Sequence, residues 1–163
     1  MSLHYAIGNA ADPPDRPVAI LHIVNNLGMW GAGFTRAINA RWGAGPERGY
    51  RFWRDTKGGY CQVSIVDPGA AYIVHLFAQR GVRRPGNPKP LDLRWLDAAL
   101  RDAALWGHAT VAAGTHPLAI AMPRIGCGLA GGRWEEVEPL VQEHLAGQFH
   151  VTVYDLEAQR HAP

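Results

Sequence analysis

The segment that most constrains the fold is the glycine-rich stretch at residues 122–134. It follows a short apolar run, residues 118–121, that predicts a buried strand, and it precedes a charged, periodic segment that predicts a helix. A glycine-rich turn between a strand and a helix can hold a phosphate, because glycine lets the backbone come close and the first N–H groups of a helix carry partial positive charge. Such turns are also glycine-rich for packing alone, and spacing does not separate the two interpretations.

The composition predicts one domain, residues 1–163, with a substantial core. Of its residues 47% are hydrophobic and 18% are charged, and the net charge of +2 favours neither a nucleic-acid nor a membrane partner. Cys61 and Cys127 stand far apart, which argues against a disulfide framework and favours a reducing, cytoplasmic setting. The N-terminal residues lack the regions of a signal peptide, and no apolar run approaches the ~20 residues that span a bilayer.

Another glycine-rich turn lies earlier in the chain, at residues 25–33. The run before it, residues 18–24, is apolar and β-branched, which predicts a strand covered on both faces. A helix is expected from Gly33 to about Arg41. His22, inside the strand, is interpreted as a hydrogen-bonded core residue rather than a ligand.

The remaining elements follow from periodicity and breakers. Further strands are expected at residues 4–7, 62–66, 72–77 and 150–155, and further helices at residues 46–57 and from Asp92 to about Trp106. Pro139 conflicts with a helix after Trp134, so that helix is expected to start close to the proline or to have an irregular first turn. The tail, residues 157–163, is expected to fray.

Strands that alternate with helices predict an α/β layered fold with a mainly parallel sheet. In such sheets ligands bind beyond the C-terminal ends of the strands. Both glycine-rich turns follow strands, so two phosphate-binding turns on one rim would suit a diphosphate, provided that the two strands are neighbours. The basic loop at residues 80–90 is either a solvated loop or a contact for a phosphate or acidic partner.

The chain resembles the macrodomain family, α/β modules that bind ADP-ribose, over nearly its whole length. The most specific match is Met-Pro-Arg-Ile-Gly-Cys-Gly-Leu at residues 122–129, continued by Trp134 and residues 151–156. Residues 25–34 and 50–53 are similar to small bacterial members of the subgroup that contains human terminal ADP-ribose protein glycohydrolase. The resemblance implies a three-layer α/β/α sandwich with a mixed, mainly parallel sheet of about six strands.

The resemblance also implies a ligand position. Gly8, Asn9 and Ala10 would approach the adenine, which Tyr154 would flank, and the two glycine-rich turns would enclose the diphosphate and distal ribose, toward which Asn25 would point. The implied ADP-ribose-binding residues are Gly8, Asn9, Ala10, Asn25, Gly31, Ala32, Gly33, Phe34, Arg124, Ile125, Gly126, Cys127, Gly128, Leu129 and Tyr154.

Three residues depart from the family pattern. Asn9 stands where the family usually has an aspartate that accepts a hydrogen bond from the adenine amine, so charge assistance is lost. Gln79 stands where the human glycohydrolase has a lysine that attacks the ribose, and Ala130 stands where it has an acidic residue. Glutamine cannot form the lysine adduct and alanine cannot act as a base, which argues against that mechanism.

Two functions are expected. The preferred one is hydrolysis of ADP-ribosyl esters, on glutamate or aspartate side chains or in O-acyl-ADP-ribose, by a water that Asn25 and Gln79 position. The alternative is a non-catalytic module that binds ADP-ribose or an ADP-ribosylated protein. ADP-ribosylated nucleic acid is a third possibility, supported only by the basic loop. The sequence indicates no cofactor and no metal motif, gives no oligomeric state, and offers Cys127 no adjacent histidine that would make it a nucleophile.

Overall fold

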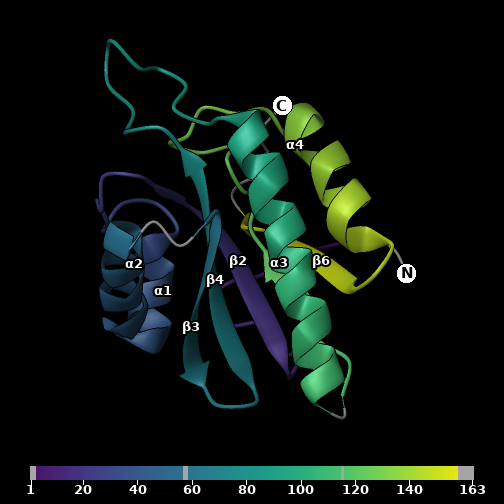
Figure 1. The fold of residues 1–163 in the computed structure, drawn as a ribbon. Coiled ribbons are helices and arrows are strands. Elements are labelled where there is room, and N and C mark those ends of the chain that lie inside the picture. The colour runs from purple at the N-terminus through teal and green to yellow at the C-terminus, as the bar shows by residue number, and fades with distance from the viewer. Residues whose placement is uncertain (1–2, 57–58, 115, 158–163) are drawn as a thin grey trace.

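The computed structural model describes residues 3–56, 59–114 and 116–157. Its middle layer is a six-stranded sheet in the order β1-β6-β5-β2-β4-β3 (Figure 1). The strands are β1 (Leu3–Ile7), β2 (Val18–Asn25), β3 (Cys61–Asp67), β4 (Ala71–Gln79), β5 (Ala119–Met122) and β6 (His150–Asp155). Of the strand pairs in the described part of the chain, only β3–β4 is antiparallel. The expected mixed, mainly parallel sheet is therefore confirmed.

Helices cover both faces of the sheet. In Figure 1 α1 (Thr35–Trp42) and α2 (Gly45–Thr56) lie on one side, and α3 (Leu93–Ala113) and α4 (Trp134–Val141) lie on the other. A short π-helical segment, η1 (Gln142–Ala146), continues α4. Among the described residues no helix has both the length and the apolar character that crossing a bilayer requires.

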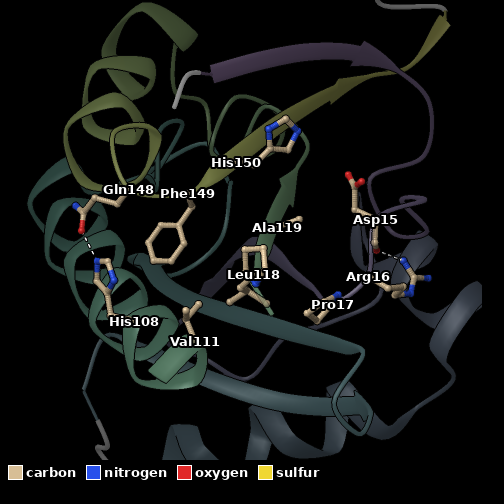
Figure 2. A pocket seen from close by; sticks show the side chains of 11 residues that line it. Asp15, Arg16, Pro17, His108, Val111, Leu118, Ala119, Gln148, Phe149 and His150 are labelled. Atoms are coloured by element: carbon tan, nitrogen blue, oxygen red, sulfur yellow. Dashed lines mark hydrogen bonds between the residues drawn. The ribbon is translucent and has the colours of Figure 1, made fainter. Parts of the chain in front are cut away.

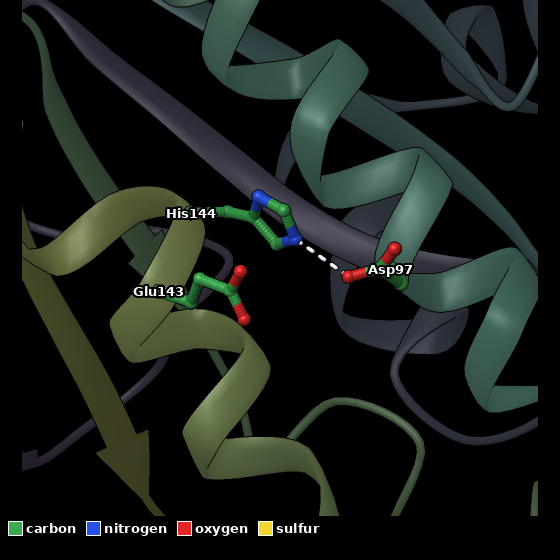
Figure 3. Close-up of side chains that lie close together, drawn as sticks. All are labelled: Asp97, Glu143 and His144. Atoms are coloured by element: carbon green, nitrogen blue, oxygen red, sulfur yellow. Dashed lines mark hydrogen bonds and ion pairs between the residues drawn. The ribbon is translucent and has the colours of Figure 1, made fainter.

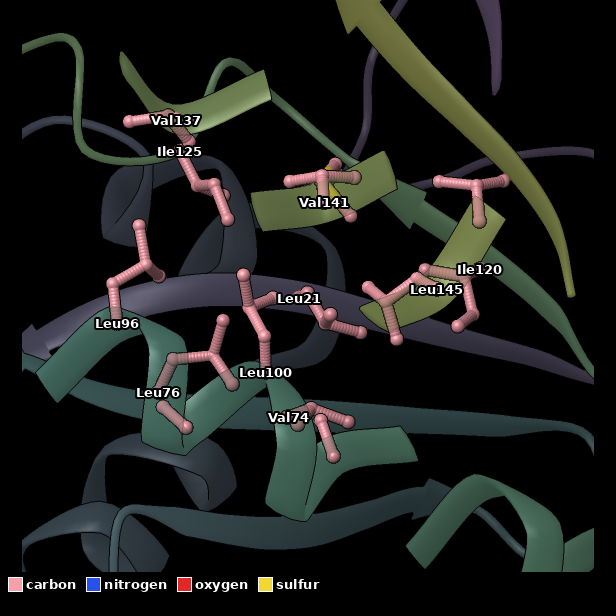
Figure 4. Close-up of a cluster of buried hydrophobic side chains, with 14 of the residues drawn as sticks. Leu21, Val74, Leu76, Leu96, Leu100, Ile120, Ile125, Val137, Val141 and Leu145 are labelled. Atoms are coloured by element: carbon pink, nitrogen blue, oxygen red, sulfur yellow. The ribbon is translucent and has the colours of Figure 1, made fainter. Parts of the chain in front are cut away.

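The central strand β2 is buried on both faces, as its sequence predicts. Val18 and Ile20 pack with Ile38 of α1, whereas Ala19 and Leu21 face the larger cluster under α3 and α4 (Figure 4). Successive side chains point to opposite faces of a strand, so a continuous apolar run joins the two layers of the core.

A buried polar chain crosses three strands. His22 Nε2 and His75 Nδ1 lie 2.8 Å apart, and His75 Nε2 lies 2.8 Å from the Ser64 hydroxyl. Burial lowers the pKa of His22 well below its ordinary value and lowers that of His75 to about 3, so both imidazoles are neutral. The prediction that His22 is a hydrogen-bonded core residue is confirmed.

Helix α3 begins as expected but ends later. Asp92 caps it by accepting hydrogen bonds from the N–H groups of Arg94 and Trp95. The predicted end near Trp106 was wrong, because the helix continues to Ala113. Gly107 lies under Phe149, where a Cβ would meet the Phe149 ring at 2.8 Å, so tertiary packing carries the helix past a glycine.

The helix does not start close to Pro139: α4 begins at Trp134, and Pro139 lies well inside it. In its first turn the Arg133 carbonyl accepts from the N–H groups of both Glu136 and Val137, at 3.0 and 3.2 Å. The flanking Val137 and Val141 are fully buried, and burying two valines offsets the cost of an interior proline, which is about 3 kcal/mol. Of the tail expected to fray, residues 158–163 lie outside the described residues.

Candidate functional site

The two glycine-rich turns leave neighbouring strands. β2 pairs directly with β5, with Val18 opposite Ala119. The first turn (residues 26–34) and the second turn (residues 123–133) therefore lie at the same end of the sheet, which is called the rim below. The turns also face each other, because a Cβ on Gly33 would lie 3.6 Å from Leu129 Cδ1. This arrangement meets the condition on which a shared rim depends.

Several main-chain N–H groups on these turns are unused. Those of Ala32, Gly33, Gly128 and Leu129 are among the N–H groups that donate to no protein acceptor within the described residues, and these four residues are exposed. By contrast, the N–H of Gly31 already donates to Thr35 Oγ1 at 3.1 Å. Unused backbone donors on two facing turns favour an anion.

The glycines of the second turn differ in what they do. Gly126 has φ +75° and packs against Ile23 and Leu91, so both its backbone and its neighbours require glycine. Gly128 has no left-handed φ, and a Cβ there would meet nothing within 4 Å. Neither conformation nor packing explains a glycine at position 128, whereas close approach of a ligand would.

Asn25 organises the first turn from within. Its Oδ1 accepts hydrogen bonds from the N–H groups of Leu27 and Met29 at 3.0 and 3.1 Å, and its Nδ2 donates to the Met29 carbonyl at 2.8 Å. The Tyr50 hydroxyl donates to the Asn25 main-chain carbonyl at 2.6 Å. Asn25 was expected to point toward the ribose, but its oxygen holds the turn, which leaves one amide hydrogen for a ligand.

The structure brings Gln79 beside Asn25. The two residues are register partners at the ends of β4 and β2, after an irregularity that shifts the pairing past Ala78. Gln79 Nε2 donates to the Gly81 carbonyl at 3.1 Å, which leaves its side-chain oxygen without a hydrogen-bond donor among the described residues. The Gly81 N–H donates to Asn26 Oδ1 at 2.7 Å, so the first turn is also tied to the loop at residues 80–90.

The proposed adenine end of the rim is formed by β1 and β6. The N–H of Gly8 donates to the Asp155 carbonyl at 3.0 Å, and a Cβ on Gly8 would lie 3.3 Å from the Tyr154 ring. Asn9 is exposed, whereas Ala10 is 3% exposed. Gly8, Asn9 and Tyr154 therefore lie together, and Ala10 can offer a ligand little beyond its main chain.

Three implied side chains are used in other ways. Arg124 forms a two-pronged ion pair with Asp155, at 2.7 and 2.8 Å, and the hydrogen bond from Arg124 lowers the pKa of the Asp155 carboxyl. Ile125 is 2% exposed and belongs to the core. Phe34 packs against the buried ring of His22. The implied contacts of these three side chains with a ligand stay predictions.

The Cys127 thiol and three carboxylates near the rim are already engaged in hydrogen bonds or ion pairs. Burial raises the pKa of the Cys127 thiol to about 11, and the thiol donates to the Ile125 carbonyl. Ala130 is buried and its carbonyl accepts from the Leu91 N–H. Of the carboxylates near the rim, Asp155 pairs with Arg124, Asp92 with Arg80, and Glu136 with Lys89.

Both turns run directly into a helix, as expected. Helix α1 starts at Thr35 after the N-cap Phe34, and α4 starts at Trp134 after the N-cap Arg133. Sequence reasoning missed Tyr50 and Asn26 as supports, because their contacts join segments that are distant in the chain.

Two other features lie away from the rim. A hollow of about 460 Å³ opens at the opposite end of the sheet from the rim, where β2, β5 and β6 begin. It is lined by His108, Phe149, His150 and neighbouring residues (Figure 2). Asp97, Glu143 and His144 gather between α3 and η1 with potential ligand atoms within 4.8 Å (Figure 3). His144 Nε2 lies 2.7 Å from an Asp97 oxygen, so this pair already joins the two helices.

Comparison with known proteins identifies the class. No family model and no curated protein matches the sequence. Among solved structures, a protein from Bacteroides thetaiotaomicron is 33% identical with a TM-score of 0.83, over 96% of this chain and 99% of that one. A macrodomain protein from Streptomyces coelicolor is 31% identical with a TM-score of 0.76, over 94% of this chain and 99% of that one.

The chain therefore belongs to the macrodomain family. A more distant likeness is to Thermosipho africanus DarTG, solved in complex with ADP-ribose, at 18% identity and a TM-score of 0.63 over 91% of this chain and 40% of that one. At that identity the likeness shows the fold alone.

Proposed function

We propose that the chain binds ADP-ribose along the rim of its sheet and hydrolyses esters of the distal ribose. The observation that carries the proposal is the set of four unused, exposed N–H groups on two turns that face each other. A diphosphate supplies two adjacent anionic groups for such donors. The macrodomain fold supports the proposal, as does the ADP-ribose complex of the structurally similar DarTG.

The spacing of the strands fits an extended nucleotide. The turns after β2 and β5 are separated from the β1–β6 boundary by two strand positions, since the order is β1-β6-β5-β2. Neighbouring strands lie about 4.8 Å apart, which gives roughly 10 Å between the proposed diphosphate and base positions. Asn25 ends β2 and Gln79 ends the next strand, β4, so the proposal puts the distal ribose beside this pair.

Ester hydrolysis requires little from the protein beyond positioning. The oxygen of a water forms a bond to the ester carbonyl carbon, the bond from that carbon to the ribose oxygen breaks, and the ribose oxygen takes up a proton. The Gln79 side-chain oxygen is free to orient the water, and an unused N–H of the second turn can stabilise the oxyanion. Binding energy from the diphosphate fixes the ester in place.

A binding module without chemistry is the second candidate. It is favoured by the ion pairing of Asp92, Glu136 and Asp155, and by the raised pKa of the Cys127 thiol, because a paired carboxylate and a protonated thiol are poor general bases. The same N–H groups would hold ADP-ribose in either case.

The test is release of ADP-ribose from a protein mono-ADP-ribosylated on glutamate. Release above the buffer blank, lost in Gln79→Ala but kept in Gln148→Ala at the opposite end of the sheet, is the result expected of the hydrolase. ADP-ribose binding by calorimetry without release of this ester would select the binding module. Failure to bind ADP-ribose at millimolar concentration would overturn both.

A further inference from the structure

The turn after β1 holds its exposed asparagine in a fixed orientation. Asn9 Oδ1 accepts a hydrogen bond from the Ala11 N–H at 3.0 Å, and the Asn9 carbonyl accepts from the Asp12 N–H at 3.1 Å. Trp42 Nε1 donates to the Ala11 carbonyl at 2.7 Å, and Arg41 pairs with Asp12 at 2.9 Å. Because only an oxygen can accept from the Ala11 N–H, the side-chain amide cannot be reversed without losing that bond.

Asn9 therefore presents its NH₂ group outward. Its amide nitrogen has no hydrogen-bond partner among the described residues, and the residue is exposed beside Gly8 and the Tyr154 ring. An aspartate in the same turn would keep one oxygen on the Ala11 N–H and present a second, negatively charged acceptor. The asparagine reverses the polarity of the atom that faces a ligand, from acceptor to donor.

We propose that Asn9 selects a base with an oxygen at position 6, so that the chain binds the 6-oxopurine counterpart of ADP-ribose at least as tightly as ADP-ribose itself. This inference rests on the proposed function, because it places the base against Asn9. The N7 edge of a 6-oxopurine offers two acceptors, N7 and O6, whereas that of adenine offers one acceptor and one donor. A single outward donor meets an acceptor at either atom of the oxopurine, but faces another donor at the adenine amine.

Replacing Asn9 by aspartate should shift the preference of the protein from the 6-oxopurine compound toward ADP-ribose, because an acceptor then replaces the outward donor. In Asn9→Asp the Ala11 hydrogen bond is kept, so the turn should fold as before. The new carboxylate oxygen accepts from the adenine amine and repels the O6 of the oxopurine. A mismatched polar contact in a recognition site typically changes affinity about tenfold or more.

The experiment is calorimetric titration with two probes, ADP-ribose and inosine diphosphate ribose, of the wild type, Asn9→Asp and Asn9→Ala. The wild type is expected to bind the inosine compound at least as tightly as ADP-ribose. Asn9→Asp is expected to move the ratio of the two dissociation constants at least tenfold toward ADP-ribose. Asn9→Ala, which lacks both polar atoms, is expected to fall between the two, and its melting temperature reports any cost to the turn.

The outcomes separate this inference from the proposed function. Tighter binding of ADP-ribose than of the inosine compound by the wild type would overturn the inference and leave the proposed function standing. An unchanged ratio in Asn9→Asp would also overturn it. Failure of both probes to bind the wild type would overturn the proposed function, and the inference with it.

Discussion

At the scale of single residues, the rim contains a glycine that neither the backbone conformation nor the packing requires. Gly128 needs neither a left-handed backbone nor close packing, and its N–H is unused. Gly132, four residues later, is the opposite case, because a Cβ there would lie 2.6 Å from the Gly126 carbonyl oxygen. The first glycine is expected to matter for the ligand, and the second for folding.

Gly128→Ala should leave stability unchanged and weaken ADP-ribose binding about tenfold, which corresponds to about 1.4 kcal/mol. The added methyl group has room in the protein but stands where the diphosphate is proposed to approach. Calorimetry and a thermal melt measure the two effects. Gly147→Ala, another glycine whose Cβ would meet nothing within 4 Å, is the matched control and should bind normally. Equal affinities for the two variants would count against the proposed diphosphate position.

Tyr50→Phe should destabilise the protein by about 1–2 kcal/mol, because the variant leaves the Asn25 carbonyl without the hydroxyl that donates to it at 2.6 Å. Urea unfolding monitored by fluorescence measures this change. Burial raises the pKa of Tyr50 to about 12, so the hydroxyl is protonated, and able to donate, at all ordinary pH values. Tyr72→Phe, on strand β4, is the control. A Tyr50→Phe protein as stable as wild type would show that the bond contributes nothing.

At the scale of elements, strands β2, β4 and β3 are joined by the His22–His75–Ser64 chain as well as by their ladders. The two imidazoles are neutral in the folded protein but have ordinary pKa values, near 6.5, when the chain is unfolded. The unfolded state therefore binds more protons below pH 6.5. Stability contributed by the neutral histidines is complete above that pH and is lost as pH falls toward the folded-state values.

The free energy of unfolding should accordingly fall between pH 7.5 and pH 5 by about 1.4 kcal/mol per pH unit for each buried histidine, once the pH is below 6.5. Urea denaturation at a series of pH values measures the slope. His150→Asn, which removes an exposed histidine, should leave the slope intact. A stability that does not change over this range would contradict the assignment of two buried neutral imidazoles.

At the scale of the whole molecule, the two ends of the sheet expose different chemical groups. The end of the sheet at the C-termini of β2 and β5 carries the unused N–H groups, whereas the hollow of about 460 Å³ lies at the opposite end and is lined largely by apolar groups (Figure 2). The diphosphate is proposed at the first of these ends, because it requires donors rather than apolar surface.

Saturating ADP-ribose should therefore raise the melting temperature of the protein by binding at the rim, and not by binding in the hollow. At a ligand concentration 100 times the dissociation constant the stabilisation is about 2.7 kcal/mol, equivalent to roughly 5–11 °C for a chain of this size. Differential scanning fluorimetry measures the shift. The variant His150→Trp, in which the hollow is narrower, should keep the full shift in melting temperature. If that variant loses the shift while Gly128→Ala keeps it, the ligand binds in the hollow and not at the rim.

The sequence by itself determined the elements that depend on local pattern. The apolar run at residues 18–24, the cap at Asp92 and the last strand at residues 150–155 were all predictable, because alternation, capping and β-branching act over a few residues. The two glycine-rich turns, and through them the family resemblance, were also visible in the chain.

Only the tertiary structure decided which of those residues are available to a ligand. It paired β2 with β5, used the oxygen of Asn25 to hold a turn, bound Arg124 to Asp155 and buried Ile125. It also carried α3 past Gly107 and α4 through Pro139, against local preference. The physical reason is the same in each case: packing and hydrogen bonding between segments distant in sequence outweigh local propensities, and they determine which polar groups are left unpaired.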